Sequence, residues 1–484
     1  MGISSLRCGL ACAGVWLLSA AWAAGEDWPQ WRGPDRDARA TGFNAPEDWP
    51  NELSQKWKVT VGDGVATPAV VGDRVFVFSR EDGNEVIRAL NAASGEEIWQ
   101  DKYETEAPRG GASNFPGPRS SPTVAGGTVV TLGARGRLCC HDVATGREVW
   151  CKSEFENEVP DFFVASSPIV VDGVVIAQLG GEDDGGILAY DLASGRERWR
   201  WTDDAPAYGS PVLMTIDGTQ VIVAPTDKNL VAVGVADGKT VWEMPYEQGR
   251  YNTATPIVDG NTLIIAGPGT GLTALKIMKV TRPDDSVLVE ERVWRNTDNS
   301  LQFNTPVLKD GLLFGLSNAG QLFCIDTRNR GQTAWAVALN PQPAERRDEE
   351  QSVENARDAK VRAALVQFVQ QEDRDRRGRD GREGFDRDRR RGEGPGRPAD
   401  GRGGGRGGRR GRGGSGYGSV VDAGDVLLAL SPAGELVVFR PNDEAYLEVA
   451  RYKVAEEGTY AYPVAVGDAI YIKDRETLAR WGLE

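Results

Sequence analysis

Asp191-Leu192-Ala193-Ser194-Gly195, followed four residues later by Trp199, is a motif that the chain repeats. Residues 91–99 and 142–150 carry the same pattern, with Asn or Asp first, Gly fifth and Trp ninth. An Asx side chain at the first position can accept hydrogen bonds from the backbone that follows, and the glycine can adopt the positive φ of a tight turn. The motif therefore predicts the last hairpin of a recurring unit.

The tryptophans give the length of that unit. Spacings of 42, 51, 49, 43, 52 and 41 residues separate successive members of the series, and periods of this size indicate a repeat architecture. Each unit also opens on a Thr-Pro or Ser-Pro step. The tryptophans are Trp57, Trp99, Trp150, Trp199, Trp242, Trp294 and Trp335, and the steps are Thr67-Pro68, Ser121-Pro122, Ser167-Pro168, Ser210-Pro211, Thr255-Pro256 and Thr305-Pro306.

The first unit shows how many strands to expect in each repeat. Its β-rich runs are Ala69–Val71, Arg74–Phe78, Val86–Leu90 and Glu97–Trp99, and turn residues such as Gly and Asp separate them. Four short strands repeated at this spacing predict the blades of an all-β propeller.

Two further units bring the number of blades to eight. Residues 418–452 have the strands and turns but lack the Pro step and the closing tryptophan, and Tyr462-Pro463 opens a last unit of three strands. Because proteins avoid unpaired strand edges, we expect the segment around Trp57 to supply the fourth strand and close the ring. The prediction is an eight-bladed β-propeller of four-stranded antiparallel blades, with blades 1–6 and the closing strand in residues 53–339 and blades 7–8 in residues 419–484.

The first residues indicate export. Arg7 precedes an apolar run from Leu10 to Trp22, and Ala21 and Ala23 are small residues at the positions that a signal peptidase inspects. The run is shorter than the ~20 residues of a membrane span, and no later stretch is apolar enough to be one. We expect a signal peptide at residues 1–23, an N-terminal segment at 24–52, and a periplasmic or secreted mature protein.

Charge separates one segment from the rest of the chain. The formal net charge is −15, yet residues 342–418 hold 20 basic and 15 acidic residues, a net +5, which leaves −20 elsewhere. This balance argues against a nucleic-acid-binding protein. For residues 340–418 we predict a charged helix over Ala344–Gln371 followed by a disordered Arg/Gly-rich spacer. An anionic surface, such as lipid or polysaccharide, is the alternative target for this segment.

The repeat resembles a known family. The Pro step, the Asx turn that ends in glycine and the closing tryptophan are similar to the PQQ-type (pyrroloquinoline-quinone-type) repeat of quinoprotein alcohol dehydrogenases and of the outer-membrane assembly lipoprotein BamB. Residues 27–34, Asp27-Trp28-Pro29-Gln30-Trp31-Arg32-Gly33-Pro34, resemble the start of exported propellers of planctomycete type. The resemblance implies the fold but not the activity, because propellers have many functions.

Few residues point to catalysis. His141 is the only histidine, so no Ser-His-Asp set or His-rich metal site is available, and its place in the repeat favours a structural role at a strand end over a general base. Cys139-Cys140-His141 lacks the spacer of a haem attachment motif. Cys139 and Cys151 lie in neighbouring strands of one hairpin, where pairing depends on register; we expect free thiols.

The cofactor question rests on the same region. Quinoprotein dehydrogenases carry adjacent cysteines near their cofactor, but Cys140 aligns with Cys324 and with alanines at positions 89 and 189, which favours a packed thiol. The family's cofactor ligands cannot be placed on this chain, so we expect no cofactor, with PQQ as the alternative. Glu182-Asp183-Asp184 could hold Ca²⁺, but without a calcium-loop series of ligands we expect a solvated turn and no metal site.

Recognition residues gather in the loops that join the outer strand of one blade to the inner strand of the next. These loops carry aromatic, arginine and amide side chains, which are typical of binding surfaces; the alternative is that they fill the central channel. The predicted site residues are Phe115, Arg119, Phe162, Phe163, Tyr208, Arg250, Tyr251, Asn252, Gln302, Phe303, Asn304 and Tyr460.

The function predicted from these observations is that of a non-catalytic, monomeric binding or assembly scaffold in the cell envelope. Its partner is expected to be an envelope protein, a polysaccharide or another anionic surface, and not nucleic acid. The alternative is an enzyme: a PQQ-dependent quinoprotein oxidoreductase, or a hydrolase or lyase that uses carboxylates.

Overall fold

A computed structural model describes residues 27–156, 158–248, 251–281, 286–339 and 417–484. The predicted signal peptide and nearly all of the predicted 340–418 segment lie outside the described residues. The chain divides into two units, Met1–Val337 with Gly413–Glu484, and Ala338–Arg412. All of the described residues except Ala338 and Leu339 belong to the first unit. No helix among its described residues is both long enough and apolar enough to cross a membrane.

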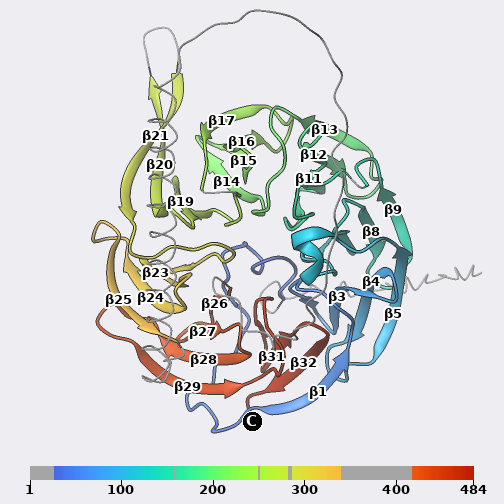
Figure 1. Cartoon of the computed structure of the whole chain (residues 1–484), viewed down its shortest axis with the longest axis vertical. Helices are drawn as coiled ribbons and strands as arrows, with labels where there is room; N and C mark the ends of the chain where they lie inside the picture. The colour runs from blue at the N-terminus through green and yellow to red at the C-terminus, as the bar shows by residue number, and fades with distance from the viewer. Residues whose placement is uncertain (1–26, 157, 249–250, 282–285, 340–416) are drawn as a thin grey trace, which may run out of the picture. The chain divides into compact units, whose positions relative to one another are not determined.

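Eight antiparallel sheets of four strands form the first unit, and Figure 1 shows them placed around a ring. The eight-bladed propeller predicted from the repeat is confirmed. Blade 1 consists of β2 (Ala69–Val71), β3 (Arg74–Glu81), β4 (Asn84–Asn91) and β5 (Glu97–Glu104). Blade 2 follows a 3₁₀ helix (Gly110–Asn114) and consists of β6 (Thr123–Ala125), β7 (Thr128–Leu132), β8 (Leu138–Asp142) and β9 (Glu148–Lys152).

The next four blades continue in chain order. Blade 3 consists of β10 (Ile169–Val171), β11 (Val174–Leu179), β12 (Gly186–Asp191) and β13 (Glu197–Trp201), and blade 4 of β14 (Val212–Ile216), β15 (Thr219–Pro225), β16 (Asn229–Gly234) and β17 (Thr240–Pro245). Blade 5 consists of β18 (Ile257–Asp259), β19 (Thr262–Gly267), β20 (Gly271–Thr281) and β21 (Ser286–Asn296), and blade 6 of β22 (Val307–Lys309), β23 (Leu312–Leu316), β24 (Gln321–Asp326) and β25 (Gln332–Ala338).

The last two blades include the closure of the ring. Blade 7 consists of β26 (Ser419–Asp422), β27 (Leu427–Leu430), β28 (Glu435–Arg440) and β29 (Leu447–Lys453). Blade 8 takes β30 (Val464–Val466), β31 (Ala469–Lys473) and β32 (Thr477–Gly482) from the end of the chain, and its outer strand is β1 (Ser54–Thr60). Antiparallel pairing of β1 with β32, for example Lys58 opposite Ala479, confirms the predicted closing strand.

The repeated motif forms the joint between neighbouring blades. Trp199 of blade 3 is buried, and its indole N–H donates to the Val235 carbonyl of blade 4 at 2.8 Å. The indole ring lies against Gly238, whose φ is +69°, and a Cβ at that glycine would stand 2.4 Å from the ring. The glycine is therefore required by the turn and by the tryptophan of the preceding blade. The same pairing joins Trp57 to Gly95, Trp99 to Gly146, Trp150 to Gly195 and Trp294 to Gly331.

The Pro steps form a second set of contacts around the channel. In each pair of neighbouring steps, the backbone N–H of one Ser or Thr donates to the hydroxyl of the next blade's Ser or Thr. The bonded pairs are Thr67 to Ser121, Ser121 to Ser167, Ser167 to Ser210, Ser210 to Thr255 and Thr255 to Thr305, at 2.9–3.1 Å. Blade 7 has no Pro step, and the Tyr462 hydroxyl of blade 8 reaches past it to donate to the Thr305 carbonyl at 3.0 Å.

Residues 27–44, named the plug below, fill the channel. The plug contacts every blade, from Trp28, which pairs with Val70 of blade 1, to Asn44, which bonds Gly467 in the first turn of blade 8. Arg32 and Arg36 are 1% and 4% exposed. Arg32 donates to the carbonyls of Thr305 and Pro306, and Arg36 to those of Ser167, Pro168 and Pro211.

The two ends of the plug lie at one end of the channel, and its Arg32 and Arg36 side chains reach the Pro steps toward the other end. Asp27 and Asn44, near its two ends, bond the first turns of blades 1 and 8 at Gly72 and Gly467. These turns lie at the far ends of the inner strands from the Pro steps. The loops that carry the predicted binding residues precede the Pro steps and so open at the other end of the channel, named the mouth below.

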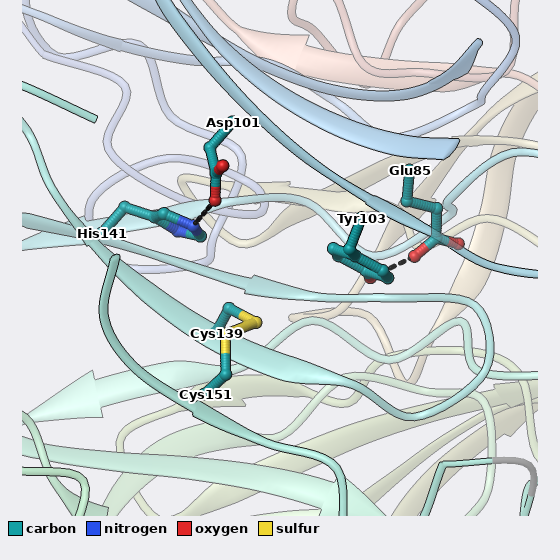
Figure 2. The surroundings of a disulfide bond; sticks show 6 residues. All are labelled: Glu85, Asp101, Tyr103, Cys139, His141 and Cys151. Carbon is teal, nitrogen blue, oxygen red and sulfur yellow. Dashed lines mark hydrogen bonds and ion pairs between the residues drawn. A yellow bond between two sulfur atoms is a disulfide. The ribbon is translucent and has the colours of Figure 1, made fainter. Parts of the chain in front are cut away.

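The expectation of free thiols at Cys139 and Cys151 is wrong, because the two form a disulfide (Figure 2). A β-bulge falls between Cys140 and His141, beyond the cysteine pair, and leaves Cys139 directly opposite Cys151 with Cα atoms 4.1 Å apart. Direct opposition brings the Cβ atoms within bonding range. Cys140 and Cys324 are buried thiols, and burial raises the pKa of Cys140 to about 11.

Candidate functional site

Three predicted residues from three successive loops form the first ring cluster at the mouth: Phe162, Tyr208 and Tyr251. The Phe162 and Tyr251 rings meet edge to face with centroids 4.8 Å apart, and Tyr208 meets Tyr251 at 5.5 Å. The backbone N–H of Phe162 also donates to the Tyr208 hydroxyl at 3.1 Å. Burial raises the pKa of Tyr208 to about 12, so its hydroxyl stays protonated at neutral pH.

A second ring cluster comes from four other loops. Phe115 of the loop before blade 2 meets Tyr460 of the loop before blade 8 at 5.0 Å. Tyr417 lies 4.8 Å from Tyr460 and stacks on Phe303 at 4.6 Å. The structure therefore brings together side chains from blades that are not neighbours, and the loops converge at the mouth. Phe303 is the most exposed member of the cluster, with 40% of its surface accessible.

Tyr417 was missed by the sequence analysis, which placed it in the 340–418 segment. A signal was nonetheless available, because Tyr417 lies just before the first strand of blade 7, at Ser419. Aromatic residues such as Phe115 and Tyr208 occupy corresponding loops of other blades. Alignment by strand starts would have included it.

Arg119 connects the two clusters. Its guanidinium donates to the Phe162 carbonyl at 2.8 Å and to the carbonyls of Phe115 and Ala112 at 3.1 and 3.2 Å. Burial lowers the pKa of this arginine. Because its donors are already used by loop carbonyls, Arg119 positions the loops of blades 2 and 3.

The predicted amide residues hold loops rather than face solvent. Asn252 is 3% exposed and donates to the carbonyls of Thr226 and Tyr246, both at 2.7 Å. Asn304 is also buried and donates to the Leu316 carbonyl at 2.8 Å.

The remaining predicted residues lie around the clusters. The Gln302 carbonyl accepts a hydrogen bond from the Thr253 hydroxyl. Phe163 has a φ of +65°, and the Arg135 guanidinium stands 5.8 Å from the centre of its ring. Arg250 lies outside the described residues.

Two adjoining hollows of about 160 and 400 Å³ lie beside the first ring cluster. Tyr208, Tyr251 and Asn252 line the smaller hollow, and the acidic residues around the two are Asp161, Glu182, Asp183, Asp203, Asp204 and Asp227. Asp204 is buried, and one of its oxygens accepts hydrogen bonds from Thr226, Lys228 and Asn229. The other five are exposed or nearly so, which gives the hollows a negative rim.

Two further titratable pairs lie between blades 1 and 2 (Figure 2). His141, 2% exposed, has its Nε2 2.8 Å from a carboxylate oxygen of Asp101. Glu85, 1% exposed, accepts hydrogen bonds from the Tyr103 hydroxyl and, at 3.0 Å, from the Ala134 N–H. Burial raises the pKa of Glu85. Neither of the two hollows described above is lined by these groups.

A family comparison identifies the repeat. Residues 54–115 and 83–337, which together exceed half the chain, match the family model described as outer membrane protein assembly factor BamB. The chain belongs to the BamB family of PQQ-type repeat propellers. BamB from Moranella endobia (strain PCIT) is 25% identical over 248 residues, 49% of this chain and 57% of that protein. The crystal structure of BamB from Moraxella catarrhalis matches with a TM-score of 0.55 at 13% identity, over 89% of this chain and 99% of that one.

The same repeat relates this BamB-family chain to an enzyme. Quinohemoprotein alcohol dehydrogenase from Comamonas testosteroni is 32% identical over 143 residues, 28% of this chain and 19% of that protein. Its crystal structure gives a TM-score of 0.59 at 14% identity, over 96% of this chain and 81% of that one. At such identities the structural matches show the fold alone. In sequence, the match spans about half of the Moranella BamB and about a fifth of the dehydrogenase.

Proposed function

We propose that this protein is an exported, non-catalytic binding or assembly scaffold of the cell envelope, and that it recognises a protein or envelope ligand at the mouth. The observation that carries the proposal is the convergence of aromatic side chains from seven successive loops into two clusters, within each of which the rings contact one another. Half-buried aromatic groups on a rigid scaffold are the usual anchors of protein interfaces.

The presence of the plug favours the interpretation that the aromatic side chains at the mouth bind a partner over the alternative that they fill the channel. Residues 27–44 contact all eight blades, and Arg32 and Arg36 bond the Pro-step carbonyls just beneath the mouth. The propeller therefore has a dedicated segment that fills its channel. Aromatic side chains at the mouth are then available for a partner.

The relatives and the charge distribution support a protein partner in the envelope. BamB proteins are named as outer membrane protein assembly factors, and the family link extends that role to this chain as a proposal. The negative rim around the hollows beside Tyr208 and Tyr251 favours a partner surface that carries Arg or Lys at this point.

Capture of partners from the native envelope tests the proposal. Immobilised protein is compared with a Tyr251→Ala, Phe303→Ala double variant and with Leu447→Ala, a control that removes an exposed apolar side chain from β29. The double variant should lose the captured protein and keep the wild-type melting temperature, since loop side chains contribute little to blade packing. Equal capture by all three proteins would refute recognition at the mouth.

The dehydrogenase relatives define the alternative function, a PQQ-dependent oxidoreductase. Two features of the described residues weigh against a quinone site of that kind. Cys139 bonds Cys151 and not its neighbour Cys140. At the mouth, the Tyr417 ring contacts the rings of both Phe303 and Tyr460. We propose that the protein works without PQQ or Ca²⁺. Incubation with both should then give neither a bound-quinone absorbance nor dye-linked alcohol oxidation, and the appearance of both signals would establish the alternative.

A further inference from the structure

Three metal-ligating side chains gather around the disulfide of blade 2. The sulfur atoms of Cys139 and Cys151 and a carboxylate oxygen of Glu148 all lie within 4.8 Å of one another. Cys139 is buried, Cys151 is half-buried and Glu148 is exposed. The group therefore reaches from the interior of the blade to solvent.

The β-bulge explains why these residues share a face. In a regular strand, Glu148 and Cys151 would point to opposite sides, because they are three residues apart. The bulge inserts one extra residue, so that Glu148 pairs with His141 while Cys151 pairs with Cys139. Cys139 and His141 are two residues apart on β8, so their side chains lie on the same face of the blade. Glu148, which pairs with His141, therefore lies on the face that carries the two sulfur atoms.

We propose that reduction of the Cys139–Cys151 disulfide by a dithiol creates a binding site for a thiophilic divalent cation of the Zn²⁺ class. The S–S bond breaks, each sulfur gains one electron and one proton, and the dithiol is oxidised to its own disulfide. When the cation binds, the two thiols lose their protons to solvent and bind as thiolates. Glu148 supplies the third ligand through a carboxylate oxygen.

The geometry and ligand chemistry fit such a cation. Thiolate bonds of ~2.3 Å in a tetrahedral site place two sulfurs roughly 3.8 Å apart. Cysteines directly opposite each other, with Cα atoms 4.1 Å apart, can reach that separation by side-chain rotation once the bond is broken. Two thiolates and one carboxylate leave the fourth position to water on the exposed side, as in zinc sites with three protein ligands.

The neighbouring cysteine does not belong to the site. Cys140 points to the opposite side of β8, where its sulfur lies 3.9 Å from the Leu192 carbonyl of blade 3. Cys324 is buried in blade 6. In the part of the chain that the structure describes, the oxidised protein therefore offers no pair of neighbouring thiols. The cation site and the disulfide are mutually exclusive states of one hairpin.

Cobalt titration of the full-length protein tests the proposal. After treatment with a phosphine reductant and its removal, Co²⁺ should bind with one equivalent per chain and give thiolate-to-cobalt absorption, while the oxidised protein should give none. Zn²⁺ should displace the cobalt and protect two thiols from alkylation. Glu148→Gln leaves the disulfide intact and should weaken binding by about tenfold or more, because loss of even supporting groups around a metal costs 10–100-fold.

Matched variants separate this site from other cysteines. Cys140→Ser should bind Co²⁺ as the reduced wild type does, and Cys139→Ser, Cys151→Ser should not bind. Near-ultraviolet circular dichroism checks that the reduced chain remains folded, and Glu148→Gln keeps the test valid if the double variant does not fold. The proposal is overturned if the folded, reduced wild type shows no thiolate-to-cobalt absorption, or if Glu148→Gln binds as tightly as wild type.

Discussion

Replacement of Gly238 or Trp199 tests whether the joint between tryptophan and turn glycine holds blades 3 and 4 together. The Trp199 ring is 8% exposed and lies against Gly238, and its N–H bonds the Val235 carbonyl. Gly218, in the first turn of blade 4, is the matched control, because its φ is +80° and a Cβ there would meet no atom within 4 Å. The two glycines share a positive φ, and only Gly238 has a ring against it.

The contacts allow the cost of each change to be worked out. Trp199→Ala leaves a cavity and an unbonded Val235 carbonyl, and should reduce the free energy of unfolding by about 3 to 5 kcal/mol. Gly218→Ala should lower the free energy of unfolding only by the penalty of placing a Cβ at positive φ, about 1 to 2 kcal/mol. Gly238→Ala should cost the same backbone penalty plus about 1 to 3 kcal/mol for overpacking, because the new alanine Cβ would stand 2.4 Å from the Trp199 ring.

A double-mutant cycle identifies the contact itself. Once Trp199 is alanine, the overpacking term disappears and Gly238→Ala should cost no more than Gly218→Ala. The coupling energy between positions 199 and 238 is then about 1 to 3 kcal/mol, and that between 199 and 218 is near zero. Urea unfolding followed by far-ultraviolet circular dichroism measures all six proteins. A contact between Trp199 and Gly238 is refuted if Gly238→Ala lowers the free energy of unfolding equally with and without the tryptophan. It is also refuted if, in the wild-type background, Gly238→Ala costs no more than Gly218→Ala.

Three other predictions concern the channel, the buried carboxyl and the charged segment. Arg36→Met removes the donors to the Ser167, Pro168 and Pro211 carbonyls and should lower the free energy of unfolding in urea by at least about 2 kcal/mol. The control Arg39→Met changes a half-exposed side chain of the plug and should alter that free energy by less than about 0.5 kcal/mol. Equal effects of the two substitutions would contradict the role of the plug. Burial raises the folded pKa of Glu85 above its ordinary 4.5, so the stabilisation from this group should be complete below that pH and be lost as pH rises through the folded pKa. Glu85→Gln should therefore flatten the dependence of melting temperature on pH above 4.5, and parallel profiles for the two proteins would count against this role. Replacing residues 344–416 with a short flexible linker should leave the melting temperature nearly unchanged, because both flanking blades are complete; a fall comparable to the loss of a blade would show that the segment packs with the ring.

Local chemistry explains why the fold could be predicted from the sequence. Each strand and each Asx turn depends on residues within one unit of about 40 to 50 positions, and the closing tryptophan recurs with the same period, so periodicity alone revealed the blades. The need to pair the open edge of blade 8 was enough to predict its fourth strand from residues near Trp57. The convergence of the loops at the mouth also followed from the order of strands within a blade.

The tertiary structure decided which side chains meet. A single bulge sets the register of β8 and β9, and neither composition nor spacing shows where it falls, so the pairing of Cys139 with Cys151 could not be read from the sequence. Phe115 contacts Tyr460 although blade 1 separates their blades, and Arg32 of the plug bonds the Thr305 carbonyl of blade 6. Such contacts depend on the angle at which each blade meets the axis of the ring, which no local pattern encodes. For the same reason the opening motif at residues 27–34 identified a family by resemblance, while its role in filling the channel emerged only when the eight inner strands were brought together around it.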